Sequence, residues 1–356
     1  MAYTTIDNPE LYFQTKLYTG DGSATQAQTF DGSEDMQPDW VWIKSRSNAE
    51  AHSLTDSVRG VTKWLESNST AAEQTNANTM KAFGTDGFSV GLAGSVGDTG
   101  QTYVAWCWKG GTTSGITTNG ATTITPSPYS FNADAGFAIL KYAGNGTAGA
   151  KVAHGMGKVP KFIITKRIDE GAESWTSYTS VTGNTKFINF NSTGAPGTAT
   201  NRWNDTDPDT VNFTLGSEGS VNASGQPLMA WCFADVQGYQ KVGSYTGNAN
   251  ADGTFVYTGF SPSFVMARIT SGTGNVNIFD IKRTDSGGGN IIDKRIKANS
   301  TAAEIDGTAN QVDFLANGFK WRGTDDDTNI SGGTFVYLAI AKSPFVNSSG
   351  VPNNAR

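Results

Sequence analysis

The chain has little cysteine and histidine, and this restricts the chemistry that it can support. Its 356 residues include two cysteines and two histidines. A disulfide framework or a structural zinc site needs more of these residues at characteristic spacings, so neither is expected. The chain also has no phosphate-binding glycine loop and no metal-ligand spacing of cysteine and histidine. These absences predict a protein that is not an enzyme.

Charged residues are scarce as well, at 16% of the chain against roughly 25% in average soluble domains. Thr, Ser, Asn and 43 glycines take their place, a composition typical of short strands joined by tight turns. The net charge of −6 would repel a polyanion, and the sequence has no basic patch. Binding to nucleic acid is therefore not expected.

No apolar run approaches the ~18 residues needed to cross a bilayer. Residues 1–10 lack the basic start and the apolar centre of a secretory signal. We therefore expect no membrane insertion, and synthesis and folding in a cytoplasm.

Landmarks that recur in the same order indicate a threefold internal repeat. The closing strands read Tyr-Val-Ala-Trp-Cys-Trp, Leu-Met-Ala-Trp-Cys-Phe and Phe-Val-Tyr-Leu-Ala-Ile. The landmarks are a strand that ends in Gly (17–20, 141–144, 244–247), a strand led by proline (38–44, 160–166, 262–268), an Asn-Ser-Thr triplet (68–70, 191–193, 299–301), an aromatic segment bounded by Gly or Asn (87–91, 212–216, 318–323) and the closing strand (103–108, 228–233, 335–340). Each unit has roughly 100 residues, enough for a core of its own.

The repeats predict an all-β fold of three tandem antiparallel β-sandwiches of jelly-roll-like form. The predicted units are residues 1–110, a Gly/Thr/Pro-rich linker 111–130, residues 131–235, residues 236–345 and a C-terminal tail 346–356. Hairpins are expected over 175–190 and 277–296, with residues 285–289 at the tip of the second. Residues 58–65 are compatible with a short helix.

The closing strand of the first unit has two unlike faces. Trp106 and Trp108 lie on one face, and Ala105 and Cys107 on the other. We expect the bulky face to fill the sandwich core and the small face to allow close approach of another sheet or subunit.

The two cysteines, Cys107 and Cys232, have equivalent positions in successive units, and the third unit has Ala339 there. Because alanine suits a small core position, both thiols are expected to be buried and reduced.

The proline-led strands carry apolar residues on both faces, at 40–43, 162–164 and 264–266. A sandwich strand needs only one apolar face, so something must cover the other. We expect contacts between adjacent units or subunits here, and a homo-oligomer, most simply a trimer or a ring.

Few residues suggest a ligand site. His52 has no nucleophile in a recognised setting, which favours a surface or hairpin position. The alternating carboxylates Asp205, Asp207 and Asp209 are weak calcium-ligand candidates, although the loop lacks the EF-hand glycine and glutamate. The acidic run 325–327 is a second, similar loop. No other cofactor is expected, and solvated turn carboxylates are the simpler interpretation of both loops.

Tryptophans provide a possible route to carbohydrate binding, because sugars stack on indole rings. The candidates are six tryptophans: Trp40, Trp42, Trp64, Trp175, Trp203 and Trp321. We expect one or two of these side chains to be exposed and the others to lie in the core. No segment indicates the paired carboxylates of a glycosidase.

The first unit resembles a family of repeated, virion- or tail-associated domains encoded by marine tailed bacteriophages. The resemblance rests on the segments 7–20, 37–46, 52–60, 87–91 and 104–108, and it covers residues 10–110 closely. The resemblance is weaker in the later units, which lack the His-Ser-Leu and Val-Arg-Gly motifs. The resemblance implies a virion component made in an infected bacterium, without catalytic residues.

The leading hypothesis is therefore a non-enzymatic structural component of a bacteriophage virion, tail- or tail-fibre-associated, with a role in host attachment. Its expected partners are further copies of itself, other virion proteins and a host cell-surface glycan. The alternatives are a capsid decoration protein, a glycan-binding adhesin and a polysaccharide-degrading tail spike.

Overall fold

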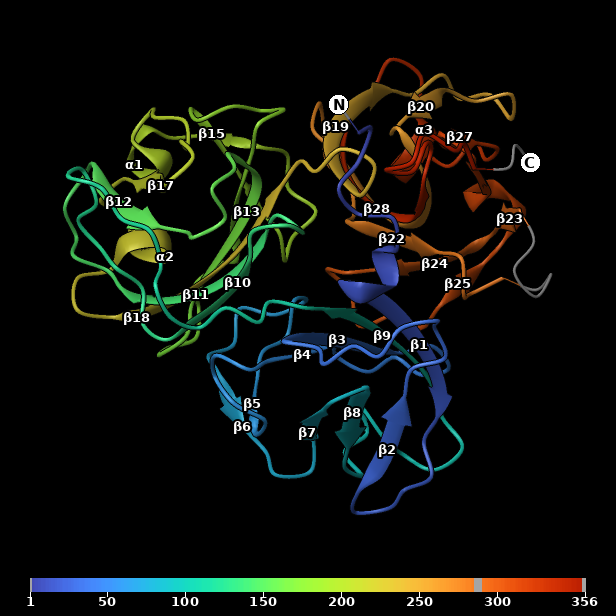
Figure 1. Ribbon diagram of the computed structural model, residues 1–356, viewed down its shortest axis with the longest axis horizontal. Coiled ribbons are helices and arrows are strands. Elements are labelled where there is room, and N and C mark those ends of the chain that lie inside the picture. The colour runs from blue at the N-terminus through green and yellow to red at the C-terminus, as the bar shows by residue number, and fades with distance from the viewer. Residues whose placement is uncertain (1, 285–289, 354–356) are drawn as a thin grey trace.

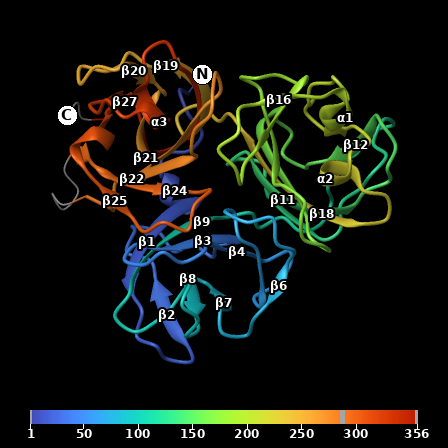
Figure 2. The ribbon, with the colours of Figure 1, turned by 180° about the vertical axis from the view of Figure 1, so that it is seen from behind.

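The computed structural model describes residues 2–284 and 290–353, and nearly all of its regular structure is β. Three lobes surround a common centre (Figure 1), and the same arrangement is seen from behind in Figure 2. Strands β1–β9 form lobe 1, β10–β18 form lobe 2 and β19–β28 form lobe 3. Within the described residues no sheet mixes strands of two lobes, and all named strand pairs are antiparallel.

Each lobe has one large sheet and at least one smaller sheet. The large sheet of lobe 1 has the strand order β1 (Phe13–Thr19), β9 (Thr102–Trp108), β3 (Trp40–Ser45), β4 (Ser53–Asp56). One smaller sheet has the order β2 (Gln26–Thr29), β8 (Gly87–Val90), β7 (Met80–Gly84), and another pairs β5 (Lys63–Trp64) with β6 (Gln74–Thr75).

The large sheet of lobe 2 has the order β10 (Tyr129–Asn132), β11 (Phe137–Ala143), β18 (Pro227–Ala234), β13 (Pro160–Arg167), β14 (Thr176–Thr179), β15 (Lys186–Asn189), β16 (Gly197–Thr198). Its smaller sheet pairs β12 (Ala150–Ala153) with β17 (Asn212–Leu215).

The large sheet of lobe 3 has the order β19 (Gln240–Thr246), β28 (Thr334–Pro344), β21 (Phe260–Ile269), β22 (Asn277–Asp280), β24 (Lys294–Lys297), β25 (Ile305–Asp306). Its smaller sheet has the order β20 (Phe255–Tyr257), β27 (Gly318–Trp321), β26 (Val312–Leu315), β23 (Ile291–Ile292).

The helices are single turns at the edges of the sheets. They are η1 (Pro9–Leu11), α1 (Thr200–Trp203), α2 (Gly219–Asn222), η2 (Thr308–Asn310) and α3 (Asp326–Asn329). None of the helices in the described part of the chain is long and apolar enough to span a membrane.

The closing strand lies between the opening strand and the proline-led strand in every lobe. Trp108 pairs with Phe13 on one side and Trp40 on the other. The corresponding partners are Phe137 and Phe162 around Phe233, and Gln240 and Phe264 around Ile340. The landmarks read from the sequence thus occupy the same places in the three large sheets.

The prediction for the faces of the closing strand was wrong. Ala105 and Cys107 line the interior of lobe 1, where Phe88 and other bulky side chains of the small sheet fill the space. Trp106 and Trp108 point instead into a core shared by all three lobes. The small face suits the lobe interior because the second sheet provides the bulk, as the mutual packing of two sheets requires.

The shared core is a layer of aromatic rings. The Trp40 ring centroid lies 4.4 Å from that of Trp108 in its own lobe, and 6.0 Å and 5.8 Å from those of Phe137 and Trp231 in lobe 2. Trp108 also lies 5.8 Å from Phe264 of lobe 3. Contacts between units over the doubly apolar strands are thereby confirmed.

The second apolar faces of the proline-led strands are thus covered by neighbouring lobes of the same chain. These faces therefore no longer argue for a homo-oligomer, which stays a prediction. All six candidate sugar-stacking tryptophans are buried, so the expectation of one or two exposed rings was wrong. Cys107 and Cys232 are free and buried, as predicted.

The Asn-Ser-Thr triplets close the hairpins. Their asparagine Oδ1 atoms accept backbone N–H groups at the start of the preceding hairpin, over 2.9–3.0 Å. The pairs are Asn68 with His52, Asn191 with Trp175, and Asn299 with Val276. A short polar side chain that satisfies an otherwise unpaired strand N–H explains why this residue recurs.

Each triplet region also contacts the next lobe, and these contacts run head to tail around the centre. The His52 imidazole meets Lys297 O of lobe 3, Trp175 Nε1 donates to Glu66 O of lobe 1, and Gly274 N donates to Thr193 O of lobe 2. Such heterologous contacts either form filaments or close into a ring. Here they close within one chain.

The irregular segments differ in how well the sequence predicted them. Residues 58–65 form turns and the short strand β5 instead of a helix. The expected linker packs on lobe 2, where Thr112 pairs with Phe131 and Ile124 with Val152. The hairpin over 175–190 is confirmed by the pairing of β14 with β15. In lobe 3, β22 pairs with β24, but the expected tip 285–289 lies outside the described residues.

Replacing Trp40 by alanine should lower the free energy of unfolding by about 3–5 kcal/mol, because the residue contacts two lobes and the cavity cannot collapse easily. Trp40→Phe should cost much less, since a phenyl ring keeps part of the stacking. Phe255→Ala is the control, because that ring is 43% exposed. Urea unfolding measures all three. A loss below 1 kcal/mol for Trp40→Ala would contradict the shared core.

Candidate functional site

Each proline-led strand ends in a buried cation at one equivalent position: Lys44, Lys166 and Arg268. Lys166 Nζ donates to Thr70 O of lobe 1 and to Glu173 O, and the Arg268 guanidinium donates to Asn189 O and Gly194 O of lobe 2. Burial lowers the pKa of Lys44 and of Lys166 to about 8. All three cations bind backbone carbonyls: Lys44 donates to Ser45 O and Asn48 O within lobe 1, whereas Lys166 and Arg268 also join their lobe to a neighbouring one.

Two buried ion pairs lie at the lobe boundaries. Arg59 Nε is 2.7 Å from Asp56 Oδ2, and Arg283 Nε is 2.6 Å from Asp280 Oδ2; all four side chains are fully buried. The Arg59 guanidinium lies over the Trp231 ring of lobe 2, at 5.8 Å from its centroid. Sequence reasoning missed both pairs, although their common Asp-x-x-Arg spacing after the same strand was a usable signal.

The second pair meets lobe 1 in the same way. The Arg283 guanidinium lies over the Trp106 ring, 5.4 Å from its centroid, and Trp106 Nε1 donates to Asp280 Oδ2 at 2.9 Å. Lobe 2 has Thr179 and Thr182 at the equivalent positions. The ion pair thus occurs where the neighbouring lobe presents a tryptophan.

His52 is a buried connector rather than a surface residue. Its Nδ1 accepts the Trp42 Nε1–H at 2.8 Å, which leaves Nε2–H to donate to Lys297 O at 3.1 Å. Burial and the nearby Lys44 cation lower the pKa of His52 to about 3. The imidazole is therefore neutral at pH 7 and fixed in one tautomer by these two bonds.

The other histidine belongs to the acidic loop of lobe 2. His154 Nε2 lies 3.1 Å from Asp209 O, and burial lowers its pKa. The Asp209 carboxylate accepts the backbone N–H groups of Val211 and Asn212, and Asp207 accepts the Tyr178 hydroxyl at 3.1 Å.

The calcium candidates thus already have protein partners in two of three cases. Throughout residues 2–284 and 290–353, no three His, Cys, Asp or Glu side chains gather as a metal site would require. Calcium binding by Asp205, Asp207 and Asp209 stays a prediction. In the second acidic loop, Asp325 caps α3 by accepting Asp327 N, and it pairs with Arg295 at 2.7 Å.

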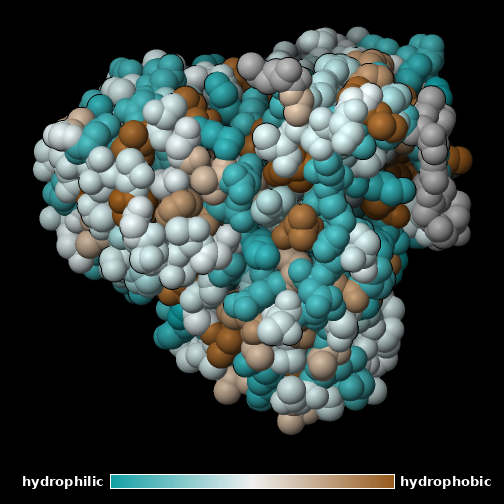
Figure 3. Space-filling model, in the orientation of Figure 1, coloured by the Kyte–Doolittle hydropathy of each residue, from teal (hydrophilic) through white to brown (hydrophobic). Residues whose placement is uncertain are grey.

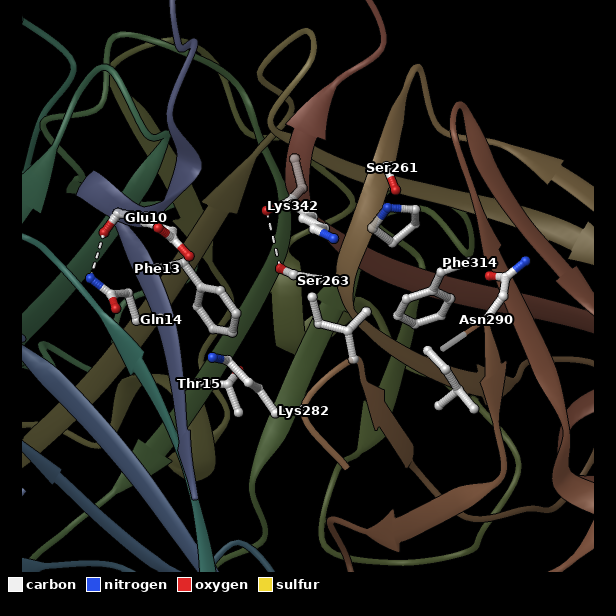
Figure 4. A pocket seen from close by; sticks show the side chains of 14 residues that line it. Glu10, Phe13, Gln14, Thr15, Ser261, Ser263, Lys282, Asn290, Phe314 and Lys342 are labelled. Atoms are coloured by element: carbon white, nitrogen blue, oxygen red, sulfur yellow. Dashed lines mark hydrogen bonds between the residues drawn. The ribbon is translucent and has the colours of Figure 1, made fainter. Parts of the chain in front are cut away.

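A cleft of about 360 Å³ opens between lobes 1 and 3 (Figure 4). Phe13 of β1 lines one side and Phe314 of β26 the other, and the amino groups of Lys282 and Lys342 reach its space. Lys282 Nζ is 3.0 Å from Asp31 Oδ1. Lys342 forms no ion pair with any carboxylate of the described residues.

Among the described residues that line this cleft, no serine or threonine hydroxyl is hydrogen-bonded to a base. Ser263 Oγ donates to Ala341 O at 3.1 Å, so its hydroxyl is bound to the backbone and not to a base. The Glu10 carboxylate accepts the Ser33 N–H and hydroxyl, at 2.7 Å and 2.8 Å. A small anionic group between two lysines and two phenyl rings is the ligand type that this lining suits.

A related cleft of about 480 Å³ lies between lobes 1 and 2, lined by Asp39, Val58 and Lys109 together with Pro128 and Tyr129. The first three residues are the lobe 1 counterparts of Ser263, Lys282 and Ala341 by strand register. The two clefts therefore share one wall that is built from equivalent strand positions.

The family described as a domain of unknown function (DUF7483) matches residues 8–344, which is nearly the whole chain. No curated protein matches the sequence.

Acidification should destabilise the protein through His52. The unfolded chain binds a proton near pH 6.5 and the folded chain only near pH 3, so the unfolded state holds more protons between these values and stability falls as the pH drops through this window. Between pH 7.5 and pH 5 the loss from this residue should be about 2 kcal/mol. Urea unfolding of His52→Gln should show a weaker pH dependence than the parent. An equal slope would refute the neutral buried imidazole.

Breaking one member of an ion pair should cost more than removing both. Asp280→Thr should lose about 3–5 kcal/mol, because the buried Arg283 loses its nearest carboxylate. The double variant Asp280→Thr/Arg283→Thr copies lobe 2, and its loss should be smaller than that of the single variant. Chemical unfolding of the three proteins measures the difference; a double variant less stable than Asp280→Thr would contradict this view.

Proposed function

The chain belongs to the DUF7483 family, and we propose that it is a non-enzymatic structural component of a bacteriophage virion, associated with the tail or tail fibre. The sequence resemblance of residues 10–110 to repeated domains of marine tailed phages supports this origin. The observation that carries the proposal is the closed head-to-tail set of three lobe contacts within one chain.

We propose further that the lobes are three copies of one β-sandwich. Supporting this, the opening, closing and proline-led strands keep one register in all three large sheets. Equivalent tyrosines also keep one bond: the hydroxyls of Tyr18, Tyr142 and Tyr245 each donate to a backbone carbonyl at 2.7 Å. A body with three similar lobes suits the threefold and sixfold positions of a phage particle.

A capsid decoration protein is the second candidate, and the same observation favours it. A single chain with three similar lobes fits a threefold site on a shell as well as one on a tail tip. In either place the partners would be other virion proteins and further copies of the chain.

Localisation in purified particles tests the proposal. Antibodies raised against the purified chain should label the tail in electron micrographs of phage particles, and peptides of the chain should occur in the mass spectrum of those particles. Antibodies against a known capsid protein serve as the labelling control. Label on the capsid would support decoration instead, and a chain present in the lysate but absent from purified particles would overturn both.

A further inference from the structure

An open groove of about 330 Å³ lies between the edge strands β19 and β20 of lobe 3. Its floor includes Gly243 and Tyr337, and its rim carries Phe255 and Tyr257. These two rings are 43% and 48% exposed, and they stand on one face of β20, two residues apart. The molecular face in Figure 3 is mostly hydrophilic to intermediate in hydropathy, with scattered hydrophobic patches.

The fold does not require aromatic residues at these positions. Ala27 and Lys151 are the counterparts of Phe255 in lobes 1 and 2. Each of the three residues pairs with the residue that follows the phenylalanine of the partner strand (β8, β17 or β27). Thr29 and Ala153 are in the same way the counterparts of Tyr257. Lobes 1 and 2 build the same strand pair without an exposed ring, so the two rings serve something other than folding.

A glycine keeps the groove of lobe 3 open. A Cβ at Gly243 would lie 2.6 Å from the Tyr337 hydroxyl, so a larger residue would displace that ring. In lobe 2 the equivalent residue is Leu140, which is fully buried, and Ile124 pairs with Val152 beside it. The corresponding space of lobe 2 is thus filled by the chain itself.

Two polar groups at the groove are available to a ligand. The Tyr337 side chain is 2% exposed, but its hydroxyl is not among the buried unpaired polar atoms of the described residues, so water reaches it from the groove. The Lys241 ammonium donates to Tyr257 O at 2.9 Å and lies 5.4 Å from the Tyr257 ring centroid, and it forms no ion pair with a described carboxylate. A ligand can replace water at both groups.

We propose that this groove binds an acidic polysaccharide, through one or two hexuronate residues. The apolar faces of the sugar rings stack on Phe255 and Tyr257, as pyranose C–H groups do on aromatic rings. The Tyr337 hydroxyl bonds a sugar hydroxyl, and the sugar carboxylate pairs with Lys241. The volume lies at the low end of small-ligand sites, which suits a short stretch of a longer glycan.

This proposal does not depend on where the protein is located in a particle, and the purified chain tests it alone. Isothermal titration with a galacturonate tetrasaccharide should give saturable binding, and a neutral cellotetraose should bind at least about tenfold more weakly. Phe255→Ala and Tyr257→Ala should each weaken galacturonate binding by about tenfold. Lys241→Met should abolish the preference for the acidic sugar.

Matched controls separate binding from folding. Leu92→Ala removes another exposed apolar side chain, far from the groove in sequence, and should leave binding unchanged. Gly243→Leu copies lobe 2 and should block the groove; thermal unfolding confirms that each variant is folded. The absence of binding to the galacturonate at millimolar concentration, or binding unaffected by both ring variants, would overturn the proposal. Equal binding of the two sugars would overturn its acidic part.

Discussion

The aromatic layer at the centre of the molecule is the interaction on which the other features depend. Trp40, Trp108 and Phe264 bring rings from two lobes into one layer, and Trp231 and Phe137 add the third. A large area of apolar surface is removed from water only when all three lobes are present. Lys44, Lys166 and the connector His52 are tolerated inside this region because backbone carbonyls accept from the two amino groups and the Trp42 indole N–H donates to the imidazole.

The three lobe boundaries are not chemically alike. Boundaries 1–2 and 3–1 each have a buried Asp–Arg pair against a tryptophan. By strand register, lobe 2 has Thr179 and Thr182 at the positions of the pair, and lobe 3 has Leu338 at the position of the tryptophan. Lobes 2 and 3 are also joined by the shortest connection, from Ala234 to Gln240. A short tether keeps two surfaces at high effective concentration, so this boundary needs less attraction of its own.

Sequence reasoning found the order of the elements because the landmarks have local causes: a proline that begins a strand, a glycine that ends one, and an asparagine that caps a hairpin. It could not assign the closing-strand faces. Alternation separates Trp106 from Cys107, but it does not say which face meets the small sheet and which meets another lobe. The same limit explains the misplaced tryptophans and His52, since their burial depends on contacts between residues more than 100 positions apart. The lobe 3 groove could not be predicted from shared landmarks, because it depends on Gly243, Phe255 and Tyr257, positions at which the other lobes have different residues.

Head-to-tail closure also determines the order in which the surfaces can be covered during synthesis. The face of Trp106 and Trp108 is complete once residue 108 has left the ribosome, but Phe264 and Asp280, which cover part of it, follow about 150 residues later. At ~5–20 residues per second, that face waits on the order of ten seconds for its cover. A nascent chain of this kind exposes a broad aromatic surface for longer than most small domains do, so its yield in a cell should depend on chaperones that hold such surfaces until lobe 3 arrives.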